Sequence, residues 1–93
     1  MFTWDPLKAA SNLAKHGVSF EEATTVFADP NAQIREDPSH SATELRRLLI
    51  GSSNNNRVLL IAYTVRPDND TQISRIISAR IANRHERKAT LRQ

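Results

Sequence analysis

Arginines at the ends of apolar segments are the residues of this sequence best suited to chemistry. Arg66 follows the apolar run 58–63, and Arg75 and Arg80 flank the short segment 76–79. An arginine presents a planar fork of five donors that binds phosphate bidentately. A converging set of such side chains suits a phosphodiester whose negative charge rises in the transition state. Solvated strand-end charges, or partners for acidic side chains, are the alternative interpretation of each arginine.

Metal-free cleavage of RNA requires little beyond such a set, because the substrate's own 2′-hydroxyl attacks the adjacent phosphorus. The protein has to stabilise the phosphate oxygens and move two protons. His16, Glu44 and Tyr63 are the candidates for proton transfer, and Lys15 is a candidate electrostatic group. Each has a structural alternative: a helix-end histidine, an ion pair of Glu44 with a neighbouring arginine, and a core position for Tyr63.

The distribution of charge indicates a polyanionic partner. The 93 residues carry a formal net charge of +3, which divides into −4 over the first 45 residues and +7 over the remainder. Nine of the ten basic side chains in the second part are arginines. We expect Arg46, Arg84, Arg87 and Lys88 to bind RNA through its phosphates. A basic surface neutralised by the acidic part of the same chain is the alternative.

Composition excludes several classes of protein. With 39% hydrophobic and 25% charged residues, the chain is typical of a globular domain, and we expect one domain over residues 1–93. The absence of cysteine excludes disulfides, zinc–thiolate sites and cysteine nucleophiles, and it is typical of a reducing cytoplasm. The three histidines have no metal-ligand spacing, and no apolar run is long enough for a membrane span. We therefore expect a cytoplasmic protein without metal or cofactor.

Two helices are predicted in the first third of the chain. Asp5 and Pro6 form an N-cap and first-turn pair that predicts a helix through about His16. Ser19 and Glu22 have the spacing of a capping box and predict a second helix. Apolar stripes at helical spacing comprise Leu7, Ala10, Leu13 and Ala14 in the first helix, and Phe20, Ala23, Val26 and Phe27 in the second.

The remainder of the chain predicts a sheet and a final helix. Four β-segments, about 33–36, 45–51, 57–66 and 71–78, are joined by short turn-rich stretches that favour antiparallel neighbours. The third segment is apolar on both alternating faces, which predicts a central strand covered on both sides. Residues 2–4 are a candidate edge strand.

Ser78 is the predicted N-cap of a helix that continues to about Leu91, with Ile81, Ala82, His85 and Ala89 on one face. The N-terminus of this helix is expected to add backbone donors and a positive dipole beside the arginines. The predicted fold class is α+β, with two N-terminal helices, a four-stranded antiparallel meander and a C-terminal helix.

Four blocks of the sequence match a known signature over essentially the whole chain. They are Phe2-x-Trp4-Asp5-x-x-Lys8-Ala9-x-x-Asn12-x-x-Lys15-His16-Gly17-Val18-x-Phe20-Glu21-Glu22-Ala23, Glu44-x-Arg46 running into Ile50-Gly51, Tyr63-Thr64-x-Arg66, and Arg75-Ile76-Ile77-Ser78-Ala79-Arg80-x-Ala82. On these residues the sequence resembles the BrnT family of bacterial toxins.

The resemblance implies a RelE-like fold and a ribonuclease toxin of a type II toxin–antitoxin pair. It also implies a cognate antitoxin with a ribbon-helix-helix domain, a 2:2 hetero-oligomer, and contact with operator DNA only through that complex. The polar residues that match the family are Lys8, Asn12, Lys15, His16, Glu44, Arg46, Tyr63, Arg66, Arg75, Ser78, Arg80, Glu86 and Arg87. In one departure, this chain has Thr90 in the region where family members often carry Tyr.

The sequence therefore predicts a metal-independent endoribonuclease that an antitoxin neutralises. The alternative is a non-catalytic or attenuated basic module that binds an acidic protein or nucleic acid. A regulator that acts on DNA alone is disfavoured, because the chain lacks a helix-turn-helix pattern.

Overall fold

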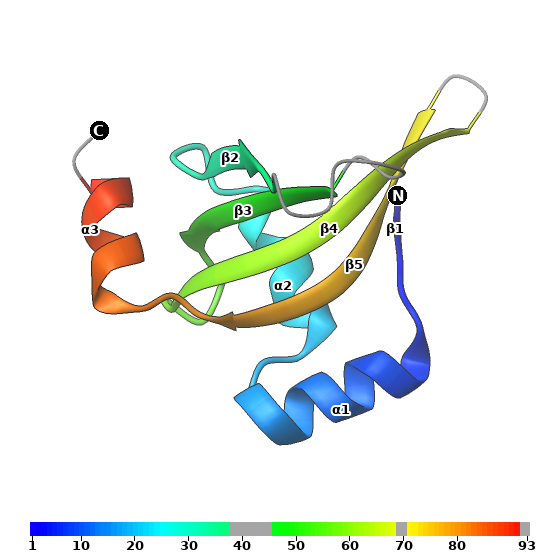
Figure 1. Cartoon of the computed structure of the whole chain (residues 1–93), viewed down its shortest axis with the longest axis horizontal. Helices are drawn as coiled ribbons and strands as arrows, with labels where there is room; N and C mark the ends of the chain where they lie inside the picture. The colour runs from blue at the N-terminus through cyan, green and yellow to red at the C-terminus, as the bar shows by residue number, and fades with distance from the viewer. Residues whose placement is uncertain (38–45, 69–70, 92–93) are drawn as a thin grey trace.

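The computed structural model describes residues 1–37, 46–68 and 71–91, and within these ranges it has three helices and a five-stranded mixed sheet (Figure 1). The strands are β1 (Phe2–Thr3), β2 (Gln33–Glu36), β3 (Arg46–Ser52), β4 (Val58–Asp68) and β5 (Thr71–Ile81). The helices are α1 (Pro6–His16), α2 (Phe20–Val26) and α3 (Arg84–Leu91). The predicted α+β class is confirmed. No helix in the described ranges is long and apolar enough to cross a membrane.

The sheet has the order β1-β5-β4-β3-β2, with β4 in the centre. Strands β2 to β5 form the predicted antiparallel meander. The candidate edge strand is confirmed as β1, which pairs in parallel with the start of β5 and turns the meander into a mixed sheet. β4 and β5 extend beyond their predicted ends, because they pair with each other over almost their whole length.

The hydrophobic core lies between α2 and one side of the sheet, which we call the inner face. On β4 this face carries Leu59, Ile61 and Tyr63, all buried. The predicted stripe of α2 packs here, with Phe20, Ala23 and Val26 fully buried and Phe27 partly buried. Because these side chains alternate with polar ones at helical spacing, the sequence alone indicated which side of α2 meets the sheet.

The opposite side of the sheet, the outer face, carries Leu60, Ala62, Thr64 and Arg66 of β4. It faces the viewer in Figure 1, with α2 behind the strands and α3 at one end beside β3. Leu60 and Ala62 are only half-buried, so the central strand is densely covered on its inner face alone.

α1 begins and ends at its predicted residues but faces in an unexpected direction. Asp5 accepts a hydrogen bond from the Leu7 amide at 2.8 Å, and Gly17 ends the helix in a left-handed conformation with a φ of 69°. Leu7 and Leu13 of the apolar stripe are 80% and 52% exposed. Asn12 is the one buried residue of the helix, so α1 turns a polar side toward β5.

The predicted start of the last helix at Ser78 is wrong. β5 continues through Ser78 to Ile81, since its β-branched residues pair with β4, and α3 begins at Arg84. Asn83 and Glu86 form the actual capping box, with both backbone-to-side-chain hydrogen bonds at 2.8 Å. No helix dipole therefore acts at residues 78–80, and Ile81 and Ala82 precede the helix whose face they were predicted to share.

Candidate functional site

A β-bulge in the central hairpin determines which β5 side chains meet on the outer face. The register shifts between Ala62 and Tyr63, so that Tyr63 pairs with Ile76 while Ala62 pairs with Ser78. In a regular strand, residues three positions apart point to opposite faces. The bulge instead brings Arg75 and Ser78 to the same outer face, because their partners on β4 alternate without interruption.

Arg66 and Arg75 line one cavity of about 180 Å³ on the outer face, together with Thr3, Thr64 and Ile73. We call it the arginine cavity. Arg75 pairs with Thr64 and Arg66 with Ile73, so the two arginines are diagonal neighbours on adjacent strands. Long side chains at such positions can reach the same point. The structure thus brings together two of the predicted site arginines.

The positive charge of the arginine cavity is not neutralised by a carboxylate within the described ranges. In the described ranges, salt bridges join Arg57 to Glu22, and Arg80 to Glu86 at 2.8 Å. Arg66 and Arg75 take part in neither. Two guanidinium groups that make no salt bridge to the described residues, beside threonine hydroxyls, are a suitable environment for a phosphate group.

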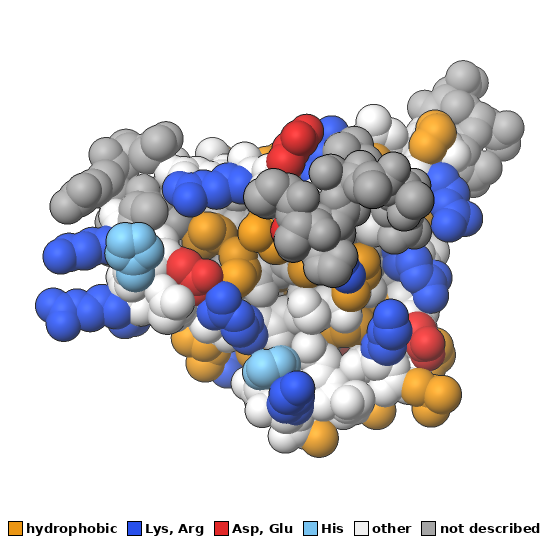
Figure 2. Space-filling view, in the orientation of Figure 1, with side chains coloured by type: hydrophobic (Ala, Val, Ile, Leu, Met, Phe, Trp, Pro, Cys, Tyr) orange, Lys and Arg blue, Asp and Glu red, His pale blue; other side chains and the backbone are white. Residues whose placement is uncertain are grey.

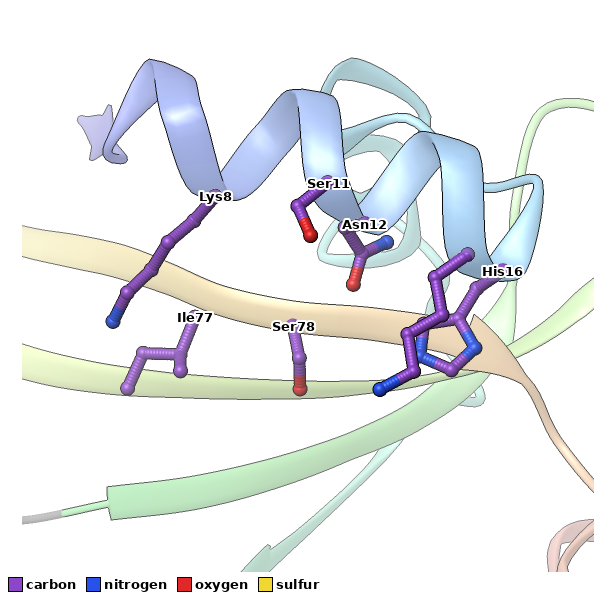
Figure 3. A pocket seen from close by; sticks show the side chains of 7 residues that line it. Lys8, Ser11, Asn12, His16, Ile77 and Ser78 are labelled. Atoms are coloured by element: carbon purple, nitrogen blue, oxygen red, sulfur yellow. The ribbon is translucent and has the colours of Figure 1, made fainter.

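Lys15 and His16 lie in a second cavity, of about 220 Å³, between α1 and β5 (Figure 3). We call it the α1 groove. Its lining residues are Lys8, Ser11, Asn12, Lys15, His16, Ile77 and Ser78. Ile73 and Arg75 of β5 line the arginine cavity, and Ile77 and Ser78, further along the same strand, line the groove. Four of the predicted catalytic residues, Lys15, His16, Arg66 and Arg75, therefore line two adjacent cavities.

Arg80 lies on the outer face opposite Leu60, apart from both cavities. Its two terminal nitrogens donate to the two oxygens of Glu86 at 2.9 and 2.8 Å. The hydrogen bonds from Arg80 lower the pKa of the Glu86 carboxyl. In this geometry Arg80 connects β5 to the first turn of α3.

Tyr63 lies on the inner face, away from both cavities. Its side chain is 2% exposed and its ring packs edge-on against Phe27, with centroids 4.9 Å apart. Burial raises the pKa of its hydroxyl. Tyr63 therefore occupies a position in the hydrophobic core, which was the structural alternative to a role in proton transfer. Glu44, which is predicted together with His16 and Tyr63 to carry protons, lies outside the described residues.

The predicted RNA-binding residues surround the outer face. Arg84, Arg87 and Lys88 are exposed on α3, and Arg46 pairs with Thr64, a residue of the arginine cavity. Figure 2 shows Lys and Arg side chains gathered over α3, over α1 and toward the hairpin end of β4 and β5. The cations form a rim around the face.

Three hydroxyl residues, Thr3, Thr64 and Ser11, line the cavities, and none of them is among the site residues predicted from the sequence. Thr64 was detectable, because it alternates with Arg66 on one face of a predicted strand. Thr3 reaches the site only through the parallel pairing of β1 with Arg75, for which the sequence has no local signal. In the described ranges, no three His, Asp or Glu side chains are grouped so that they could hold a metal ion.

Comparison with solved structures identifies the class of fold. The crystal structure of the Brucella abortus ribonuclease toxin BrnT matches with a TM-score of 0.66 and 23% sequence identity, over 90% of this chain and 99% of that one. This likeness establishes a shared fold. No curated protein sequence matches the chain.

The family follows from the sequence itself. Residues 4–86 match the family model described as the ribonuclease toxin BrnT of type II toxin–antitoxin systems. The chain belongs to the BrnT family, as its four sequence blocks indicated. At the level of the family, it is a ribonuclease toxin whose partner is an antitoxin.

Proposed function

We propose that this protein is a metal-independent endoribonuclease whose scissile phosphate binds in the arginine cavity. The observation that supports this most directly is the convergence of Arg66 and Arg75, both without a carboxylate partner in the described ranges, on one cavity. Arg66 and Arg75 supply two positive charges that can stabilise the phosphate. Family membership supports ribonuclease chemistry for this cavity.

The proposed reaction is an in-line displacement within the RNA. The 2′-oxygen forms a bond to phosphorus while the bond from phosphorus to the 5′-oxygen breaks, which leaves a 2′,3′-cyclic phosphate. Charge accumulates on the two non-bridging oxygens, and Arg66 and Arg75 stabilise it with charge-assisted hydrogen bonds. Thr64 is close enough to the same cavity to donate from its hydroxyl.

Two protons move in this reaction, one from the 2′-hydroxyl and one to the departing 5′-oxygen. We propose that His16 and Glu44 carry them, because burial makes Tyr63 inaccessible to substrate. Lys15 contributes positive charge beside His16. Arg80 supports the site by holding α3, whose exposed cations contact RNA together with Arg46.

Substitution of the cavity arginines tests the proposal. We expect R66A and R75A each to lower kcat for RNA cleavage about 10²- to 10³-fold, because each removes a donor to the transition state. R35A is the matched control, since Arg35 is exposed on β2 and lines neither cavity. Cleavage by the wild-type protein should persist in EDTA.

A single 2′-deoxy substitution at the cleaved position should abolish cleavage there, because it removes the nucleophile. Efficient cleavage of the deoxy-substituted strand contradicts the proposed mechanism. Folded wild-type protein that binds RNA and leaves it intact contradicts the activity and favours the non-catalytic binding module.

The proposed partner is an antitoxin with a ribbon-helix-helix domain, assembled with the toxin as a 2:2 complex in the cytoplasm. Operator DNA is contacted through the antitoxin. The rim of cations on the outer face supports an antitoxin with an acidic segment that covers the cavities. Such a segment is negatively charged, as is the RNA that it excludes.

A further inference from the structure

We propose that the α1 groove binds a second backbone phosphate, one or two nucleotides from the scissile phosphate. A single RNA strand then follows β5 from the arginine cavity to α1. The inference rests on the proposed function of the arginine cavity, and it assigns a phosphate-binding role to the lysines and serines of the adjacent groove, beside the proton transfer proposed for His16.

The side of α1 that lines the groove is built from polar residues, while Ala9 packs against the hydrophobic core. Lys8, Ser11, Asn12 and Lys15 follow one another at spacings of three, one and three residues, which places them on one side of a helix. In a helix that packs for stability this side is apolar. Here the apolar residues Leu7 and Leu13 face solvent, and the polar side encloses a cavity.

Asn12 holds the helix in place without filling the groove. Its amide nitrogen donates to the carbonyl oxygen of Ala79 at 2.8 Å, and its amide oxygen accepts from the Ala79 amide at 3.1 Å. The remaining groove side chains make no salt bridge within the described ranges. They are free to bind a ligand.

The groove has the donors that a phosphodiester requires. Lys8 and Lys15 supply two ammonium groups, Ser11 and Ser78 supply hydroxyls, and no carboxylate of the described residues lines the cavity. Along the groove, Ser78 lies between Lys8 and His16 (Figure 3). An anion above Ser78 is therefore approached by positive charge from both ends of α1.

The position of the groove favours RNA over an isolated anion. Ser78 and Arg75 share the outer face because of the β-bulge, and their partners Ala62 and Thr64 are two residues apart on β4, about 7 Å at the usual rise of a strand. One or two nucleotides of an extended strand span such a distance. Both cavities also take lining residues from β5.

Binding of an uncleavable RNA tests the groove independently of catalysis. A fluorescent, fully 2′-O-methylated decanucleotide is titrated with wild-type protein, K8Q, K15Q and the double variant over a range of salt. We expect the double variant to bind about tenfold more weakly at low salt. The slope of log K for RNA binding against log salt concentration is negative, and its magnitude should decrease by about 0.7 for each lysine removed.

Two controls separate the groove from the rest of the surface. L7Q places the same new side chain on the solvent side of α1, and R35Q removes an exposed charge that lines neither cavity. Both should retain the affinity of wild-type protein. A 2′-O-methylated dinucleotide, whose single phosphate occupies one cavity, should bind wild-type protein and the double variant far more similarly than the decanucleotide does.

Cleavage adds a readout that a merely structural lysine would not change. On a long substrate we expect K8Q to raise KM with little change in kcat, because Lys8 has no part in the proposed proton transfer and binds ground state and transition state alike. An unchanged melting temperature excludes a general loss of fold.

Equal affinity and equal salt slope in the wild-type protein and the folded double variant would overturn the inference. So would a groove that binds inorganic phosphate but not the decanucleotide, or one whose lysines bind only an acidic peptide. If the double variant binds the decanucleotide more weakly as expected, but neither the wild-type protein nor any variant cleaves RNA, the groove is a phosphate site. Only the proposed ribonuclease activity is then wrong.

Discussion

The arginines of this protein differ by the partners that their guanidinium groups have. Arg57 binds Glu22, and Arg80 binds both oxygens of Glu86, whereas Arg66 and Arg75 reach a cavity that no carboxylate in the described part of the chain lines. Glu22 is buried, and it accepts hydrogen bonds from Arg57 and, at 2.6 Å, from Ser53. These contacts, chiefly that of Arg57, lower the pKa of Glu22 to about 2.

The lowered pKa of Glu22 predicts a dependence of stability on pH. Glu22 has a lower pKa in the folded protein than its usual 4.5, so its contribution is complete above pH 4.5 and is lost as the pH falls toward 2. The contribution is about 2 kcal/mol, because water around the partly exposed Arg57 screens the pair.

Urea denaturation between pH 5 and pH 2.5 measures this contribution. E22Q should lose less stability than wild-type protein over that interval. E21Q, which changes an exposed neighbour on the same helix, should behave like wild-type protein. Parallel stability curves for E22Q and the wild-type protein are incompatible with the role of Glu22.

At the scale of elements, one side chain connects α1 to the sheet. β1 pairs with β5 only at Ser74 and Arg75, so the edge of β5 beyond them meets α1 instead of a strand. The Asn12 amide pairs with both backbone groups of Ala79, as a neighbouring strand would, and donates to the Val18 carbonyl oxygen at 2.9 Å. The position of the α1 groove therefore depends on Asn12.

We expect N12A to lower the free energy of unfolding by about 2–4 kcal/mol, because it leaves the buried polar groups of Ala79 and Val18 without their partner. Chemical denaturation measures the change. S11A alters the adjacent exposed position and should cost less than about 0.5 kcal/mol. A midpoint for N12A equal to that of S11A contradicts the account.

For the whole molecule, the division of charge along the sequence becomes in large part a division between faces. α2 has two acidic residues in its first turn and lies behind the sheet, while Arg66, Arg75 and Arg80 lie on the outer face (Figure 1). Arg57 is an exception, because it binds Glu22 of α2. A ribonuclease with such an exposed basic face needs an inhibitor of opposite charge in the cell that produces it.

Paired expression tests this requirement. Expression of the chain alone should arrest growth, and expression together with its cognate antitoxin should relieve the arrest, because we propose that the antitoxin covers the outer face. R66A combined with R75A should be harmless without the partner. Growth arrest by that double variant, at equal protein levels, would contradict a toxicity that depends on RNA cleavage.

Short-range patterns were sufficient for much of the fold and for half of the site. The pair Asp5-Pro6 and the box of Ser19 with Glu22 located both N-terminal helices, because capping acts within one helical turn. The meeting of Arg66 and Arg75 was also predictable, since a short turn brings adjacent strands together in a hairpin.

The remaining features depend on contacts between distant parts of the chain. The bulge opposite Ala62 and the continuation of β5 through Ser78 follow from pairing with β4, which overrides the helix-capping preference of an isolated serine. The outward direction of Leu7 and Leu13 follows from the bond between Asn12 and Ala79, 67 residues apart in sequence. Hydrophobic periodicity indicates which side of a helix is apolar, but only packing against the sheet decides which side is buried.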